Sequence, residues 1–509
     1  MPPLPNPDPQ FLELRCRLRE IQDVEAAIAL LQWDQATYMP SGGIAARARQ
    51  IAALKQIAHQ KCTDVAIGDL LERLSAREAS VSEDAIAVRP LRRIRQEYER
   101  ARRIPSPFVA RAAHHQAIAY GAWVAAHTEG DFRAVEPLLE QTLDLSREFA
   151  SFFPEAEHVA DPLIQNGDRT LTVSRLRSLF EPLHRELHTL LDTLLAAPPI
   201  DDTCVHQFYS ETDQINFCNG ILSRMGYDFE RGRRDTALHP LTVQFSPGDV
   251  RLTTRVSEHH LHHALFSTIH EVGYALYEQS RDPELGGTHW GGGVASGFRH
   301  SQSRLWENRV GRSRAFWEWF YPQLQGTFIR QLGHLSVEQF YLAVNRVNPC
   351  TLRTEADEIT HNLHIMIRFD LELDLLEEKL AVADLPEAWN ERYRREFGRV
   401  PEGDRDGVLQ DPHWYGGWVG GMFQGYALGD LIGTQLYEAA VREDPEIPVD
   451  IERGNFQRLH HWLQRNVYPA AAGDTADELV ERVTGSPLSL EPFLEYLRNK
   501  YGYLYNCKF

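Results

Sequence analysis

The sequence predicts a mainly α-helical protein with one small β-sheet, and three patterns support this fold class. Apolar residues recur at i, i+3, i+4 and i+7 in VEAAIALLQW (24–33) and AARARQIAALKQIA (45–58), as on the packed face of a helix. Residues 238–256 depart from this spacing, because polar and apolar side chains alternate in LTVQF and VRLTTRV around the turn sequence SPGD. Glycine-rich segments at 284–298 and 414–425 then interrupt sequence that is otherwise helical.

The helical pattern begins after a proline-rich stretch, residues 1–10, that we expect to be a flexible tail. It runs to about residue 157 with breaks at YMPSGG and RIPSPF. Residues 171–195 predict a further amphipathic helix with Thr172 as its N-cap, and helical spacing returns after the predicted sheet. No internal repeat or long linker divides the chain, so we expect a single body over residues 11–509.

Charge and cysteine usage limit the partners and the compartment. The net charge of −19 argues against binding to nucleic acid or to an anionic membrane surface. No window approaches 18 uninterrupted apolar residues, so no membrane span is predicted. The six cysteines form no CxxC pair, and the N-terminus lacks the basic and apolar regions of a signal peptide. These features predict a cytoplasmic protein with reduced thiols.

The first chemical signal is His270-Glu271-Val272-Gly273-Tyr274. Positions i and i+4 share one face of a helix, so an HExxH motif presents two imidazoles to one metal ion and its glutamate to a water molecule. Here Tyr274 stands in the place of the second histidine, so the motif by itself is a weak signal.

Four further segments give the motif a context. DVRLT (249–253), RHSQ (299–302), LRTEAD (352–357) and GVLQDPHW (407–414) join HEVGY in the order of a known set of patterns. Together they resemble DxRxT, HExxH, HES(Q), IRxxAD and GxxQDxHW of the thermostable carboxypeptidase family, the carboxypeptidase Taq type. ALLQWDQATYMP, GYDFERGRRDTALHP and FLEYLRNKYGYLY extend the resemblance along nearly the whole chain.

The resemblance implies an elongated or saddle-like helical body with a long substrate groove, assembled as a homodimer. It implies an N-terminal helical region of about residues 11–200 and a catalytic region of about residues 201–509. It also implies one divalent metal ion, with zinc as the first candidate and cobalt or manganese as others. The substrate class would be a peptide or acyl-amino acid with a free C-terminal carboxylate.

The departures from the family pattern fall on the metal site. The family binds its metal through both histidines of HExxH and the glutamate of HES, whereas this chain has His270, Tyr274 and His300 at those positions. Arg299 replaces the histidine of HES, and Met422 stands where the family has tyrosine. Two imidazoles and one deprotonated phenol would conserve the donor types and the charge of the family's ligands. We therefore predict His270, Tyr274 and His300 as metal ligands.

The resemblance also assigns roles to residues that the chain retains. Glu271 would take a proton from the attacking water and pass it to the leaving amine. Arg353 and Arg251 would bind substrate, with the guanidinium of Arg353 suited to bidentate capture of a carboxylate. An internal salt bridge between Arg353 and Asp357 is the alternative. His413 is expected to line the pocket as a catalytic residue.

Other histidines are weaker candidates. His361 and His364 lie in THNLHI, and the pairs at 259–260 and 262–263 are expected to be solvated helix surface rather than ligands.

Three functions remain open from the sequence. The first is a metal-dependent amide hydrolase of the carboxypeptidase type. The second is an iron or copper enzyme repurposed for oxidative chemistry, because two histidines and one anionic oxygen resemble the ligand set of non-haem iron. The third is a catalytically silent relative that keeps the fold for binding.

Overall fold

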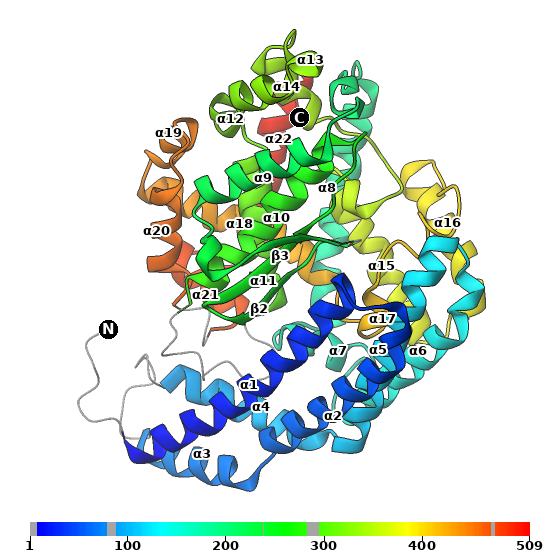
Figure 1. The fold of residues 1–509 in the computed structure, drawn as a ribbon, viewed down its shortest axis with the longest axis vertical. Coiled ribbons are helices and arrows are strands. Elements are labelled where there is room, and N and C mark those ends of the chain that lie inside the picture. The colour runs from blue at the N-terminus through cyan, green and yellow to red at the C-terminus, as the bar shows by residue number, and fades with distance from the viewer. Residues whose placement is uncertain (1–7, 79–87, 238, 282–294, 470–473) are drawn as a thin grey trace.

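The first half of the chain is a series of long helices in the computed structural model, which describes residues 8–78, 88–237, 239–281, 295–469 and 474–509. α1 packs along α2, α2 packs along α5, and α3 contacts α4 (Figure 1). The bounds are α1 Pro9–Thr37, α2 Ile44–Cys62, α3 Val65–Glu78, α4 Val88–Arg103, α5 Ser106–Glu129, α6 Glu136–Ser151, α7 Asp161–Gly167 and α8 Val173–Ala196. The predicted run of helices and the predicted break at YMPSGG are confirmed.

Local sequence explains several of these helix ends. Asp8 accepts a hydrogen bond from the backbone N–H of Gln10 and is followed by a proline at the first helical position of α1. Thr172 caps α8 as predicted, because its hydroxyl oxygen accepts from the backbone N–H of Arg175 at 3.3 Å. Gly130, with φ of 71°, ends α5 in the left-handed conformation that glycine adopts without strain.

A three-stranded sheet follows α9 (Glu211–Met225) and has the order β1-β3-β2. β2 (Thr242–Ser246) and β3 (Asp249–Thr254) form the antiparallel hairpin that the alternation predicts. β1 (Arg234–Thr236) pairs with β3 in parallel and lies before the predicted range. Its sequence, RDT, has no apolar alternation, so its extended state depends on pairing with β3 rather than on local pattern.

The second half of the chain surrounds α10 (Leu261–Gln279), which carries the HEVGY motif. α10 contacts β2 and β3, α9, α11 and the π-helical turn Leu305–Gly311. The remaining helices are α11 Ser296–Arg304, α12 Arg314–Thr327, α13 Ile329–Leu332, α14 Val337–Val344, α15 His361–Leu376, α16 Leu385–Phe397, α17 His413–Gly416, α18 Gln424–Glu443, α19 Ile447–Glu452, α20 Gln457–Asn466, α21 Ala476–Thr484 and α22 Glu491–Tyr505. Among the described helices, none combines the length and apolar character needed to cross a bilayer.

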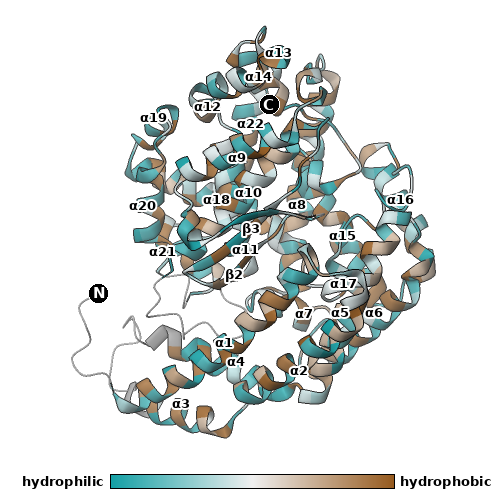
Figure 2. Ribbon diagram, viewed as in Figure 1, coloured by the Kyte–Doolittle hydropathy of each residue, from teal (hydrophilic) through white to brown (hydrophobic). Residues whose placement is uncertain are grey.

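Among the described residues, apolar side chains form one large buried cluster and two small ones. The large cluster runs from Phe108 in α5 to Tyr505 in α22. The small clusters lie among α1, α3 and α4, and among α1, α2 and α5. Figure 2 shows hydrophobic and hydrophilic residues alternating around α1 and α2, as expected for amphipathic helices with one packed face. The mainly helical fold is confirmed, whereas the division near residue 200 and the long groove stay predictions.

Gly273, inside the HEVGY motif, permits a close approach of α10 and α11. A Cβ atom at this position would lie 2.6 Å from the carbonyl oxygen of Gln302 and 2.6 Å from the Cα of Ser303. We expect Gly273→Ala to lower the free energy of unfolding by about 1–3 kcal/mol, because the backbone of α11 would have to shift. Urea denaturation followed by circular dichroism measures this change. Gly220→Ala in α9 is the control, since its Cβ would meet nothing within 4 Å, and an equal loss in both variants would contradict the explanation.

Candidate active site

His270 in α10 is oriented by a carboxylate. Its Nδ1 lies 2.8 Å from Oε2 of Glu307, which belongs to the π-helical turn behind the motif. Burial opposes ionisation of Glu307, but ion pairs with Arg304 at 3.0 Å and Arg312 at 3.3 Å hold the pKa of this carboxyl well below its usual range. Glu307 therefore accepts the Nδ1 proton of His270 and leaves the Nε2 lone pair free to bind a ligand or metal.

Tyr274 and His300, the two residues that depart from the family's ligands, are hydrogen-bonded to each other through the phenol oxygen and Nδ1. The ring centroid of Tyr274 is 5.3 Å from that of His270 and 5.8 Å from that of His300. Burial raises the pKa of Tyr274 well above 10 and lowers the pKa of His300 well below 6.5. In this state the neutral phenol donates to a neutral imidazole.

Arg299 covers the other side of the phenol. Its guanidinium carbon is 4.8 Å from the ring centroid of Tyr274, and Nη2 donates to the carbonyl oxygen of Thr242 at 3.1 Å. Nε lies 3.6 Å from a carboxylate oxygen of Glu278. Thr242 and Glu278 therefore hold the guanidinium of Arg299 in its position next to the phenol.

Glu271 is buried against the sheet. Its side chain is 4% exposed, and Oε2 accepts a hydrogen bond of 2.6 Å from the hydroxyl of Thr242 in β2. Burial raises the pKa of Glu271 above its usual value, which makes the carboxylate a stronger base. The hairpin thus holds in place the residue that we predict to transfer protons.

Arg353 forms a buried salt bridge, but not with the predicted partner. Its Nε and Nη2 lie 3.1 and 2.5 Å from Oδ1 of Asp411, and Nε of Arg368 lies 2.7 Å from Oδ2 of the same carboxylate. The alternative pairing with Asp357 is wrong, because Asp357 accepts the backbone N–H and the hydroxyl of Thr360 and so ends the loop before α15. Two guanidinium groups share one carboxylate, which leaves an excess positive charge.

Tyr426 in α18 connects this charged group to the altered ligands, and it was not predicted. Its ring centroid is 3.9 Å from that of His300, its hydroxyl is 3.1 Å from Nε2 of His413, and the guanidinium of Arg353 lies 4.9 Å from its ring centroid. Burial lowers the pKa of His413 to about 3, so this imidazole is neutral at physiological pH. The position directly after the second glycine-rich segment was the available sequence signal for Tyr426.

The other predicted residues, Arg251, His361 and His364, lie further from Tyr426 and its partners. Arg251 in β3 pairs with Asp249 at 2.8–2.9 Å and lies over the ring of Phe245, so the contacts it makes with described residues are within the sheet. His361 contacts Arg304, one of the partners of Glu307. His364 lies 2.8 Å from the hydroxyl of Tyr393. The predicted substrate contact of Arg251 stays a prediction.

The expectation that the paired histidines at 259–260 and 262–263 are solvated is wrong for three of the four. His259 is exposed, but His260 and His262 are half-buried, and the His263 side chain is only 7% exposed and lies 3.1 Å from Glu355. The segment is partly covered because His206 and Glu355, from other parts of the chain, contact it.

Comparisons with known proteins agree with this arrangement. Residues 13–501 match the sequence profile of the carboxypeptidase Taq (M32) metallopeptidase family. The chain is 39% identical to thermostable carboxypeptidase 1 of Thermus thermophilus, over 98% of this chain and 100% of that protein. It is 33% identical to carboxypeptidase 1 of Bacillus subtilis, over 97% of this chain and 98% of that protein.

Solved structures support the same assignment. The M32 carboxypeptidase of Deinococcus radiodurans R1 superposes with a TM-score of 0.88 at 42% identity, over 98% of this chain and 100% of that one. A Pyrococcus furiosus carboxypeptidase superposes with a TM-score of 0.88 at 29% identity, over 97% and 99% of the two chains. The predicted family, helical fold and hydrolase function are confirmed.

A metallopeptidase family implies a metal ion, and the donor set on these elements fits one. His270 presents Nε2 with its Nδ1 already held by a carboxylate, which is the usual environment of a metal-binding histidine. Tyr274 and His300 add one oxygen and one nitrogen donor in contact with each other. The chain is therefore a metallocarboxypeptidase that belongs to the carboxypeptidase Taq (M32) metallopeptidase family.

Proposed function

We propose that this chain removes C-terminal residues from peptides with one divalent metal ion held by His270, Tyr274 and His300. The observation that carries this proposal is the contact between Tyr274 and His300. If the family's second histidine and its glutamate had been lost independently, there would be no reason for their replacements to form a hydrogen bond with each other beside His270. Zinc is the first candidate for the ion, with cobalt or manganese as others, because two imidazoles and one oxygen suit these cations.

The hydrogen bonds of His270 and Tyr274 indicate where their protons lie before the ion binds. His270 offers Nε2 because Glu307 holds its Nδ1 proton. Tyr274 must release its proton to become an anionic ligand, so the cation would take the place of the proton that the phenol shares with His300. When bound, a divalent ion supplies Lewis acidity and lowers the pKa of water.

Glu271 is the proposed general base. Its raised pKa makes the carboxylate a stronger base, and the hydrogen bond from Thr242 fixes which carboxylate oxygen stays free. After attack on the peptide carbonyl, the same carboxyl group would return its proton to the leaving amine.

The excess positive charge of Arg353 and Arg368 over Asp411 is the proposed anchor for the C-terminal carboxylate of the substrate. Tyr426 joins this anchor to His300, and neutral His413 lies beside it to hydrogen-bond the substrate. The substrate class is therefore a peptide or acyl-amino acid with a free carboxylate.

Hydrolysis of matched peptides tests this function. We expect the zinc-, cobalt- or manganese-loaded protein to cleave an N-acylated dipeptide, with kcat/KM about 10–100-fold lower for the same dipeptide with a C-terminal amide, because a hydrogen bond to a charged group is worth about 1.5–3 kcal/mol. Equal rates on acid and amide would contradict the carboxylate anchor. Absence of cleavage with all three metals would contradict the proposed reaction.

Tyr274→Phe tests the ligand set directly. The variant keeps the aromatic ring beside His270 and removes only the phenol oxygen. We expect metal affinity to fall by at least about 10–100-fold, the range seen when groups that support a metal site are removed. Equilibrium dialysis with metal analysis measures the affinity. Tyr277→Phe is the matched control, since Tyr277 is a buried tyrosine of the same helix that packs on Phe298.

Equal affinity in Tyr274→Phe and Tyr277→Phe would contradict the ligand assignment. So would a metal-bound structure with the phenol oxygen beyond about 3 Å from the ion, because oxygen ligands of zinc lie at about 2.0–2.2 Å. The double variant Tyr274→His, His300→Glu is expected to restore a site like that of the family. Iron or copper in the purified protein, with a phenolate charge-transfer band, would instead favour oxidative chemistry.

We also propose a homodimer, as the family resemblance implies. A solution mass close to that of one chain across a wide concentration range would contradict it.

A further inference from the structure

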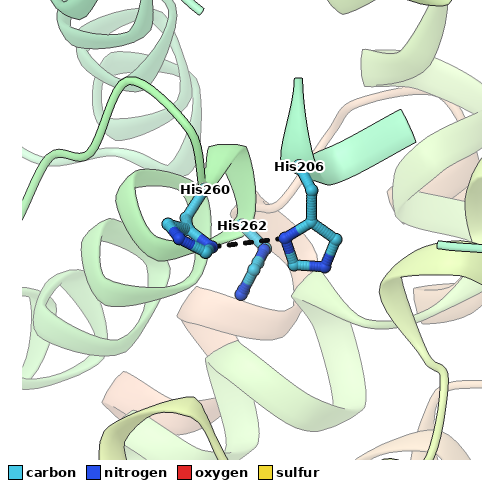
Figure 3. A group of neighbouring side chains, drawn as sticks. All are labelled: His206, His260 and His262. Atoms are coloured by element: carbon cyan, nitrogen blue, oxygen red, sulfur yellow. Dashed lines mark hydrogen bonds between the residues drawn. The ribbon is translucent and has the colours of Figure 1, made fainter. Parts of the chain in front are cut away.

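Four histidines gather where the short helix η3 (Thr203–His206) meets the start of α10. They are His206, at the end of η3, and His260, His262 and His263, at the beginning of α10. Figure 3 shows the rings of His206, His260 and His262 facing one another, with His262 between and below the other two. The rings of His260 and His263 stack at 4.7 Å.

The spacing of the nitrogens suits one shared ion. Nδ1 of His206 lies 3.2 Å from Nδ1 of His260, and one ring nitrogen from each of His206, His260 and His262 falls within 4.8 Å of the others. Two nitrogens at about 2.0–2.1 Å from a tetrahedral zinc ion are about 3.3 Å apart. The first pair therefore already has the separation that two ligands of one ion would have.

A carboxylate lies beside His206, on the side of its ring away from His260. Nε2 of His206 lies 3.3 Å from Oδ2 of Asp202, which is also paired with Arg346. With its proton on Nε2, next to Asp202, His206 presents the lone pair of Nδ1 to His260. A carboxylate behind a histidine is the usual support of a metal ligand.

His262 supplies the third nitrogen. Its Nδ1 is buried and has no hydrogen-bond partner among the described residues, although an unpaired buried polar atom is costly. One ring nitrogen of His262 lies within 4.8 Å of a ring nitrogen of His206 and of one of His260, so an ion held by the three residues would give this ring a partner.

A second group of possible ligands in the described chain, His184, His188 and Glu396, lacks these features. The Glu396 carboxylate lies 2.8 Å from the ring of His184 and 2.7 Å from that of His188. Each of its two histidines therefore already has a direct carboxylate partner, and the unpaired buried polar atoms of the described residues include none from this group.

We propose that His206, His260 and His262 form a second metal site, for a divalent transition metal of the zinc, cobalt or nickel class. Three imidazoles with no carboxylate among them select such borderline cations over calcium or magnesium, and a fourth position stays open to water. His262 precedes His270 by eight positions, which is about 12 Å along α10, so the two sites are separate. The ion would tie η3 to the helix that carries the candidate active site.

Metal titration of the tag-free, metal-stripped full chain tests the second site. We expect calorimetry with zinc to show one tightly bound equivalent fewer in the double variant His206→Gln, His262→Gln than in the wild type. Titration with cobalt should likewise lose one component of its visible absorption. His259→Gln is the matched control, since His259 is the exposed histidine of the same segment, and it should keep the wild-type stoichiometry.

Equal stoichiometry and affinity in the wild type and the double variant would overturn the proposal. Binding at the cluster only in the millimolar range would do the same. Because the double variant could be destabilised, anomalous diffraction at the zinc edge on wild-type crystals gives an independent result. A peak about 2.0–2.1 Å from the three nitrogens supports the site, and its absence at saturating zinc contradicts it. Peptide hydrolysis is expected to persist in the double variant, so this outcome is distinct from failure of the active-site assignment.

Discussion

Glu271→Gln is expected to reduce peptide hydrolysis by about 10²–10⁴-fold, the usual contribution of a positioned general base. Glutamine has nearly the same shape and can still accept the hydrogen bond from Thr242, so the fold and the metal affinity should be retained. What it cannot do is take up a proton. The measurement is kcat/KM on an N-acylated dipeptide, with metal content determined on the same samples.

Two further variants serve as comparisons for Glu271→Gln. Glu258→Gln removes an exposed carboxylate just before the same helix and should leave the rate unchanged. Thr242→Val should give an intermediate loss, because it removes only the group that orients Glu271. If Glu271→Gln retains the wild-type rate while binding metal normally, then Glu271 is not the base.

Asp411→Asn is expected to lower the free energy of unfolding by about 3–5 kcal/mol, because it leaves buried charges without their partner. Asp411 binds both Arg353 and Arg368, and the side chain of Arg368 is 0% exposed. The asparagine amide is neutral and can satisfy the geometry of one guanidinium at most. Urea denaturation followed by circular dichroism measures the loss.

The control for this variant is an exposed ion pair. Glu13→Gln removes a carboxylate partner of Arg17 in α1, where the side chains of Arg17 and Glu13 are 34% and 52% exposed, and should cost no more than about 1 kcal/mol. Adding Arg368→Met to Asp411→Asn should recover part of the stability, because one of the stranded charges is then gone. Similar losses of stability in Asp411→Asn and Glu13→Gln would contradict the conclusion that Asp411 compensates two buried guanidinium groups.

The candidate site was predicted in part because its motif is local. His270, Glu271 and Tyr274 lie within five positions on one helix, so helical spacing alone places them together. The resemblance added His300 from the next motif, and the structure brings it into contact with Tyr274. Arg353 was predicted as a charged residue of the pocket, but the carboxylate that compensates it, Asp411, was not identified as its partner.

Three features of the site required the fold. Glu307 orients His270 across 37 positions, and Tyr426 packs against His300 although more than a hundred residues separate them in the sequence. The third is the histidine group, in which His206 meets His260 across 54 positions. From the sequence alone, HHLHH (259–263) resembles a polar helix face, because nothing in these residues indicates that η3 packs over them.

The sequence by itself determined the helical class, the hairpin, the cap at Thr172 and the family, because periodicity, capping and motif spacing operate within a few residues or are preserved in order along the chain. Tertiary structure alone decided which charges are compensated and which nitrogens are left unpaired, as with Asp411 and His262. The physical reason is that hydrogen bonds and ion pairs depend on distances of about 3 Å between groups that only packing brings together.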